Sequence, residues 1–371
     1  MHAVRHPAVA GSFYPADPAT LRRQIDGFLD EARTSVEADL PAPKAIVAPH
    51  AGYVYSGSTA ALAYADAERR RDEVRRVVLL GPCHRVATRG LALPGARAFR
   101  TPLGDVPVAA VGGLPHVATS PDVHLLEHSL EVHVPFLQVI LDSFELVPLA
   151  VGDAPPAVVA DVIEALWGGP ETLVVVSTDL SHYLTYDRAN AVDAETIEKV
   201  LDVAGPIDPR RACGARPLNG LLEVARRRGL APELLGACNS GDTAGERSRV
   251  VGYAVDGGVH HAPNDRLHRS VLPRSLHRAE VVAVDTLRPG MVALGSSVVG
   301  DGTQLGATRV ALLELVRMRG EDRAELGAVV ASVRVGKDFG VTLVHAQFSC
   351  PAGSLSRPQL GVVHRVVDFH H

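Results

Sequence analysis

Three short apolar runs, each closed by a turn and a histidine, constrain this 371-residue chain more than any other feature. The histidines that follow these runs are His50, His84 and His182. Continuous apolar runs rich in β-branched residues are typical of strands buried on both faces, as in a sheet covered by helices. Strand-like and helix-like segments alternate along the chain, which predicts an α/β fold with a central, mostly parallel sheet flanked by helices.

The three histidines are expected to lie at one edge of that sheet. In open α/β sheets, ligands bind outside the carboxyl ends of the strands. Neutral imidazoles that converge on one point make a metal site. The alternative for each histidine is an ordinary surface or loop hydrogen-bonding role. Asp179, three residues before His182, is either part of the site or a loop cap.

Two further segments carry candidate site residues. Tyr53 and Tyr55 follow His50 in the segment APHAGYVYSG, where their hydroxyls can face a ligand and the alternative is a packed structural turn. The segment DVHLLEHSLEVHVPFLQ, residues 122–138, predicts a helix that is kinked or ended by its proline. On that helix His124, His128 and Glu131 share a face and can supply a ligand, a proton shuttle or a partner to a ligand, whereas His133 turns away.

Composition and charge indicate the partners, the domain boundary and the location that we expect for this protein. Hydrophobic residues make up 46% and charged residues 21% of the chain, with a net charge of −5, which gives no indication of a nucleic-acid or membrane partner. Residues 1–263 carry 24 Lys+Arg against 32 Asp+Glu, and residues 264–371 carry 13 against 10, so a domain boundary is predicted after residue 263. Four cysteines without a CxxC pair and no segment of membrane-spanning length predict a cytoplasmic protein.

A set of motifs in residues 1–260 resembles the Memo family, whose prokaryotic members are called AmmeMemoRadiSam system protein B. In chain order the motifs are RHPAVAGSFYP, APHAGYVYSG, GPCH, TPLG, EHSLEVHVPFLQ, TDLSHY, and NSGD followed by VVGYA. The resemblance implies a fold similar to the class III extradiol dioxygenases, which open aromatic rings with non-haem Fe(II).

The resemblance also implies a metal site at His50, His84 and His182. In animal members a cysteine completes the site, and it falls in the segment that matches residues 239–243, where this chain has no cysteine. An all-nitrogen or nitrogen-plus-carboxylate ligand set is therefore expected. The carboxylate candidates are Asp242, Asp179 and Glu131. Fe(II) is the expected metal, because two histidines and a carboxylate suit iron and dioxygen, with copper or zinc as alternatives.

We therefore expect an extradiol-dioxygenase-like oxidoreductase that acts on a small aromatic substrate. In this interpretation His128, His182 and Asp179 perform acid–base or related catalytic roles. The substrate pocket is lined by Tyr53, Tyr55, Glu131 and Asp242. The alternative is a non-enzymatic scaffold that binds a metal or a phosphopeptide, and the resemblance suggests an AMMECR-like protein and a radical SAM enzyme as partners.

Residues 264–371 lie outside the resemblance and are unassigned. They are expected to form a small α/β domain or a partly disordered extension. The patterns predict strands over residues 280–284 and 292–299 and a helix over residues 307–319.

Overall fold

A mixed sheet of nine strands forms the core of the first of two units, Met1–Ala279 and Glu280–His371. The structure, a computed structural model, describes residues 4–36, 41–257, 260–261, 310–317, 326–335 and 341–348. The domain boundary predicted after residue 263 lies outside the described residues, so it stays a prediction.

Four parallel strands occupy the middle of the sheet in the order β2, β9, β3, β8. They are β2 (Ala45–Ala48), β9 (Thr172–Ser177), β3 (Arg76–Pro82) and β8 (Glu145–Val151). Every residue of β2 and β9 is buried, as the apolar runs predict. Because the four strands are parallel, their carboxyl ends meet at one edge of the sheet. The predicted α/β fold with helices on a largely parallel sheet core is confirmed.

Shorter or antiparallel strands extend the sheet on both sides. Beyond β8, β4 runs antiparallel to it and pairs in parallel with β7, and beyond β2, β13 is antiparallel and pairs with both β10 and β12. These strands are β4 (Leu91–Leu93), β7 (Val117–Thr119), β10 (His182–Leu184), β12 (Leu234–Asn239) and β13 (Val250–Gly257).

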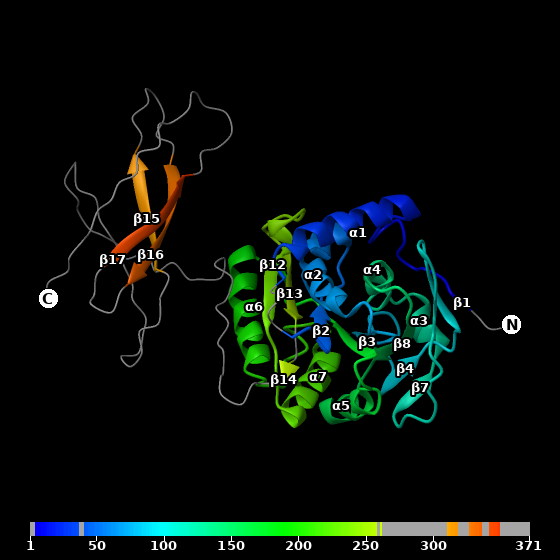
Figure 1. Cartoon of the computed structure of the whole chain (residues 1–371). Helices are drawn as coiled ribbons and strands as arrows, with labels where there is room; N and C mark the ends of the chain where they lie inside the picture. The colour runs from blue at the N-terminus through cyan, green and yellow to red at the C-terminus, as the bar shows by residue number, and fades with distance from the viewer. Residues whose placement is uncertain are drawn as a thin grey trace. The chain divides into compact units, whose positions relative to one another are not determined.

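Helices cover both faces of the sheet and enclose two separate hydrophobic cores. Successive residues of β3 point to opposite faces, so Val77 and Leu79 belong to one core and Val78 and Leu80 to the other. Figure 1 shows α1 and α4 on one side of the sheet and α5 and α7 on the other. The helices are α1 (Pro18–Arg33), α2 (Tyr53–Ala67), α3 (Pro121–Leu125), α4 (Val134–Ile140), α5 (Pro156–Ala165), α6 (Tyr186–Leu201) and α7 (Ala215–Arg228), with single 3-10 turns η1 (Glu68–Arg70), η2 (Glu131–His133) and η3 (Ser240–Asp242).

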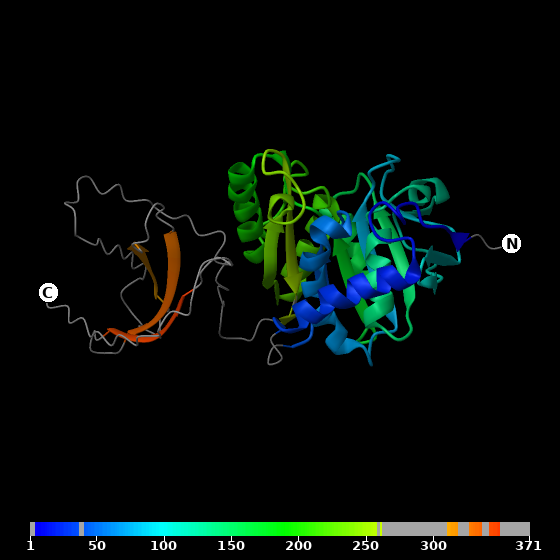
Figure 2. The ribbon, with the colours of Figure 1, turned by 90° about the horizontal axis from the view of Figure 1, so that it is seen from above.

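The first helix illustrates how local sequence sets an element. Asp17 caps α1 by accepting a hydrogen bond from the Thr20 amide, and Pro18 occupies the first helical position. Leu21, Ile25 and Leu29 form its buried face, which packs against α2, and Figures 1 and 2 both show these two helices side by side.

The single helix predicted for residues 122–138 is wrong. The segment forms α3, a loop, η2 and α4 in succession. The helix is interrupted because the buried Glu127 carboxylate accepts hydrogen bonds from the backbone amides of His128 and Ser129. In a continuous helix these two amides would donate to backbone carbonyl oxygens instead. His124, His128 and Glu131 therefore do not share one helical face.

Small sheets complete the described structure. β1 (Val4–Arg5), β5 (Ala98–Thr101) and β6 (Gly104–Pro107) form one, and β11 (Leu230–Ala231) pairs with β14 (His260–His261). In the second unit β15 (Val310–Arg317), β16 (Leu326–Val335) and β17 (Val341–Phe348) form an antiparallel sheet. The helix predicted over residues 307–319 is thus a strand where it is described, and the strands predicted over 280–284 and 292–299 lie outside the described residues. No helix in the described parts of the chain is long and apolar enough to cross a membrane.

Candidate metal centre

Three histidines from three segments meet at the carboxyl edge of the parallel strands. His50 follows β2 and His84 follows β3, whereas His128 comes from the loop between α3 and η2. Ring centroids lie 5.1 Å apart for His50 and His84, 5.5 Å for His50 and His128, and 4.8 Å for His84 and His128. One nitrogen of each ring lies within 4.8 Å of a nitrogen of each other ring. This spacing allows the three imidazoles to bind one ion.

The tautomer of His50 follows from its buried partner, Ser177. The Ser177 hydroxyl lies 2.6 Å from the carbonyl oxygen of Ser129, 2.6 Å from His50 Nδ1 and 2.8 Å from His133 Nε2. A carbonyl oxygen can only accept, so the single hydroxyl proton goes to Ser129 and both imidazoles must donate to Ser177. His50 therefore carries its proton on Nδ1, and its Nε2 presents a lone pair.

The contact with Ser177 also determines the tautomer of His133. Because His133 donates from Nε2, its Nδ1 accepts the hydrogen bond from the Tyr64 hydroxyl at 2.7 Å. Burial, followed by the neighbouring imidazoles, holds the pKa values of His50 and His133 well below the ordinary histidine value. Both rings are accordingly neutral, as a metal-binding imidazole and its support must be.

The tautomer of His84 is set by a buried carboxylate, Glu127. Glu127 accepts hydrogen bonds from His84 Nδ1 at 2.9 Å and from the His84 backbone amide at 2.5 Å. Burial alone would raise the pKa of Glu127, but the donors from His84, together with the Ser129 amide, lower it to about 2. The ionised carboxylate holds the proton on Nδ1 of His84 and leaves Nε2 free, which is how carboxylates orient metal-binding histidines.

His128 is the third imidazole of the cluster, less exposed than His84 and less buried than His50. Its Nδ1 is buried without a hydrogen-bond partner, and it lies 3.5 Å from the nearest Glu127 oxygen. Burial is the main cause of a lowered pKa at His128. A buried ring nitrogen without a partner is costly unless a ligand completes it, so the His128 ring has hydrogen-bonding or ligating capacity that no described residue uses.

A carboxylate and a thiol also approach Nε2 of His50. Asp179 Oδ1 accepts from the His50 amide at 2.7 Å, Asp179 Oδ2 lies 3.9 Å from His50 Nε2, and Cys213 Sγ lies 3.2 Å from the same nitrogen. One atom each of His50, Asp179 and Cys213 lies within 4.8 Å of the others. Since His50 Nε2 has no proton, the Cys213 thiol donates to it. Burial raises the pKa of both the Asp179 carboxyl and the Cys213 thiol.

Comparisons with known proteins agree with the motifs of the sequence. Residues 5–256 match the Memo-like protein family. A MEMO1 family protein of Methanothermobacter thermautotrophicus is 36% identical over 277 residues, which cover 68% of this chain and 99% of that protein. For MEMO1 family proteins of Methanopyrus kandleri and Sulfolobus acidocaldarius the identities are 38% and 35%, with 97% of each protein covered and 68% and 67% of this chain. The chain belongs to the Memo-like family.

The Memo-like chain does not bring His182 into the imidazole cluster. The His182 Nδ1 donates to the carbonyl oxygen of Leu180 at 2.8 Å, which ties the ring to its own loop. The ring is still near enough to affect the electrostatics of Asp179 and His50. Of the three residues predicted to hold the metal, His50 and His84 lie together, and the third histidine near them is His128.

Two predicted pocket carboxylates are engaged elsewhere. Glu131 is fully buried and pairs with Arg5, while the Ala8 and Val9 amides and the Tyr14 hydroxyl donate to it at 2.7, 3.0 and 2.5 Å. It therefore anchors the N-terminal segment. Asp242 is exposed and accepts from the Tyr186 hydroxyl at 2.6 Å and the Asn239 amide at 3.0 Å, as part of a capping box.

The two predicted pocket tyrosines also separate. Tyr53 is buried, donates to the Val132 carbonyl oxygen at 2.7 Å and packs against Phe136, so its hydroxyl serves the core. Tyr55 is 38% exposed, and it lies two residues further along the first turn of α2. Only Tyr55 of this pair has a surface that a ligand can reach.

Sequence reasoning missed four residues of the centre: Glu127, His133, Ser177 and Cys213. Glu127 stands directly before His128 in the motif EHS, and Ser177 ends β9, so position next to a chosen histidine or at a strand end was a usable signal for both. His133 was assigned to the wrong face by the helix prediction. Cys213 lies in a loop before α7, and only the tertiary structure places it beside His50.

Proposed function

We propose that this Memo-like protein is a metal-dependent redox enzyme, a non-haem iron oxygenase that acts on a small aromatic substrate. One observation carries the proposal: His50, His84 and His128 converge with the lone pairs of His50 and His84 fixed by buried partners. Neutral nitrogen ligands with a nearby carboxylate and open positions suit Fe(II). Bound Fe(II) would mediate the transfer of electrons to dioxygen from the aromatic substrate, which is the group that is oxidised.

Side chains of this protein would bind the ion and would hold or transfer protons beside it. His50 and His84 would bind through Nε2, and their Nδ1 protons would stay on Ser177 and Glu127. His182 and Asp179 lie beside the cluster rather than in it, which suits proton transfer to or from a bound substrate.

Exposed apolar side chains close in sequence to the site histidines agree with an aromatic substrate. Among the residues whose side chains are described, every large hydrophobic residue that is strongly exposed lies within five positions of His50, His84, His128 or His182. These residues are Val54, Tyr55, Val86, Leu125, Leu126 and Tyr183. Exposed apolar side chains next to the site histidines could contact the ring of a bound substrate.

The test is metal content followed by oxygen consumption. Protein purified without oxygen is expected to hold near-stoichiometric Fe(II), and a His50→Ala/His84→Ala double variant is expected to lose it. The loaded wild type is then expected to consume oxygen with a catechol or an aminophenol. Iron retained by the double variant would contradict the site. Iron binding without oxygen consumption across such a panel would contradict the oxygenase and favour the scaffold alternative.

A further inference from the structure

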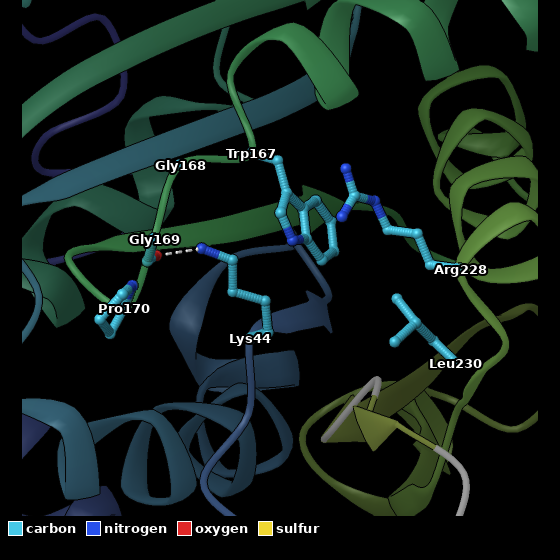
Figure 3. Close-up of a pocket in the computed structure, with 7 residues that line it drawn as sticks. All are labelled: Lys44, Trp167, Gly168, Gly169, Pro170, Arg228 and Leu230. Carbon is cyan, nitrogen blue, oxygen red and sulfur yellow. Dashed lines mark hydrogen bonds between the residues drawn. The ribbon is translucent and has the colours of Figure 1, made fainter.

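A separate pocket of about 260 Å³ lies at the opposite edge of the sheet (Figure 3). It is built by Lys44, directly before β2, by the loop from Trp167 to Pro170 before β9, and by Arg228 and Leu230 around the end of α7. Ser177 is the last of the six residues of β9, and it lies about 17 Å from Thr172 at this edge. The pocket is therefore independent of the candidate metal centre.

Two cationic side chains flank the indole ring of Trp167, as Figure 3 shows. Lys44 Nζ lies 5.3 Å and Arg228 Cζ lies 4.8 Å from the ring centroid, within the range of cation–π attraction. Burial, then the neighbouring Arg70, lowers the pKa of Lys44 to about 8. The like charges of Lys44, Arg70 and Arg228 thus disfavour one another here, and an anion would relieve that repulsion.

Each of the two flanking cations keeps at least one hydrogen-bond donor that no described residue uses. Lys44 Nζ donates to the carbonyl oxygens of Gly169 and Thr172, both at 2.6 Å, and an ammonium has three N–H groups. The Arg228 guanidinium makes no hydrogen bond within the described part of the chain, and its ion pair with Glu164 spans 3.5 Å. Glu171, the other nearby carboxylate, accepts from the Gly169 amide and the Thr172 hydroxyl.

We propose that this pocket binds a small organic carboxylate. The guanidinium fork of Arg228 and the third N–H of Lys44 would donate to the carboxylate oxygens, a pairing for which the planar fork is suited. The faces of Pro170 and Leu230 and the indole edge supply apolar walls for the body of the ligand. A volume of about 260 Å³ is large enough for a molecule of the size of benzoate.

The chain carries its own reporter for this site, because Trp167 is its single tryptophan. Titration of metal-free protein with sodium benzoate is expected to give a saturable change in tryptophan emission. Arg228→Gln is expected to weaken benzoate binding about tenfold, since charge-assisted hydrogen bonds are lost. Arg226→Gln removes the same charge on the same helix, where Arg226 pairs with Glu223 away from the pocket, and is expected to bind as the wild type does.

Further ligands and variants decide between the outcomes. Benzylamine, which has the same ring and the opposite charge, is expected to leave the emission unchanged. A linear, unsaturable response, or equal affinity in Arg228→Gln, would overturn the proposal. Inorganic phosphate that binds as well as benzoate would overturn the carboxylate assignment. The His50→Ala/His84→Ala variant is expected to bind benzoate normally, so this test is independent of the metal centre.

Discussion

The two edges of the sheet hold polar clusters of opposite chemical character. At the carboxyl edge, the protons of His50 and His84 are committed to Ser177 and Glu127, so lone pairs face the centre. At the amino edge, Lys44 and Arg228 keep unused donors beside Trp167. The difference shows that the charge of a ligand can be inferred from the hydrogen-bonding groups that the protein does not use itself. Unused lone pairs attract a cation, and unused N–H groups attract an anion.

The largest expected effect is on Fe(II) affinity, and it distinguishes the role of His128 from that of His182 at the carboxyl edge. His128→Ala is expected to lower Fe(II) affinity by about a hundredfold or more, because removal of a ligand exceeds the ten- to hundredfold cost of losing a ligand's partner. His182→Ala is the matched control and is expected to keep the affinity, as its ring is held by Leu180. Anaerobic metal titration measures both. A larger loss of Fe(II) affinity in His182→Ala than in His128→Ala would instead make His182 the third ligand.

The next effect contrasts two buried glutamates four residues apart. Glu127→Gln is expected to lower Fe(II) affinity by about ten- to a hundredfold, since the amide no longer holds the His84 proton as a carboxylate does. Glu131→Gln breaks the buried pair with Arg5 and is expected to cost roughly 3–5 kcal/mol of unfolding free energy. The metal affinity of its folded fraction should not change. Equal losses of Fe(II) affinity in the two variants would contradict the assignment of a metal-supporting role to Glu127 and a structural role to Glu131.

A smaller effect concerns the thiol that caps His50. The Cys213 thiol donates to the lone pair that the metal needs, so Cys213→Ala is expected to raise Fe(II) affinity about fivefold, the equivalent of one net hydrogen bond. Cys238→Ala, which removes a thiol that contacts Thr59 instead, should leave the affinity unchanged. A tenfold or larger loss in Cys213→Ala would instead make the thiolate a ligand.

The smallest effect is the pH dependence of the amino edge. The pKa of Lys44 is lowered to about 8, first by burial and then by Arg70, with Arg228 acting in the same direction and Glu171 against it. The ammonium is present below that value and lost above it, so benzoate affinity should fall as the pH rises through about 8. Lys44→Gln should show a lower affinity that does not vary over this range. Tryptophan emission measures both, and a flat wild-type profile would exclude Lys44 from the site.

Local sequence pattern predicted the elements that burial alone determines. The apolar runs before His50 and His84 became β2 and β3 because such runs are stable only when both faces are covered. Asp17 and Pro18 likewise marked the start of α1. These features depend on neighbours in the sequence, so they can be derived without knowledge of tertiary contacts.

The remaining features depend on long-range contacts. Glu131 satisfies Arg5, more than a hundred residues away, and Glu127 satisfies His84, 43 residues away, so periodicity gave no means of telling their roles apart. His182 follows the buried strand β9, as expected, but its Nδ1 donates to the Leu180 carbonyl oxygen and its ring is not part of the imidazole cluster. The pocket around Trp167 was missed because its residues come from strand starts and a helix end, which share no local pattern.

X-ray absorption of the Fe(II)-loaded protein would test the central claim most directly, because it reports the atoms bound to the metal. The account predicts a nitrogen and oxygen shell with the scattering of three imidazoles and no sulfur, reduced to two imidazoles in His128→Ala. A sulfur shell that disappears in Cys213→Ser, or an imidazole count unchanged by loss of His128, would contradict the assignment of His50, His84 and His128 as the metal centre.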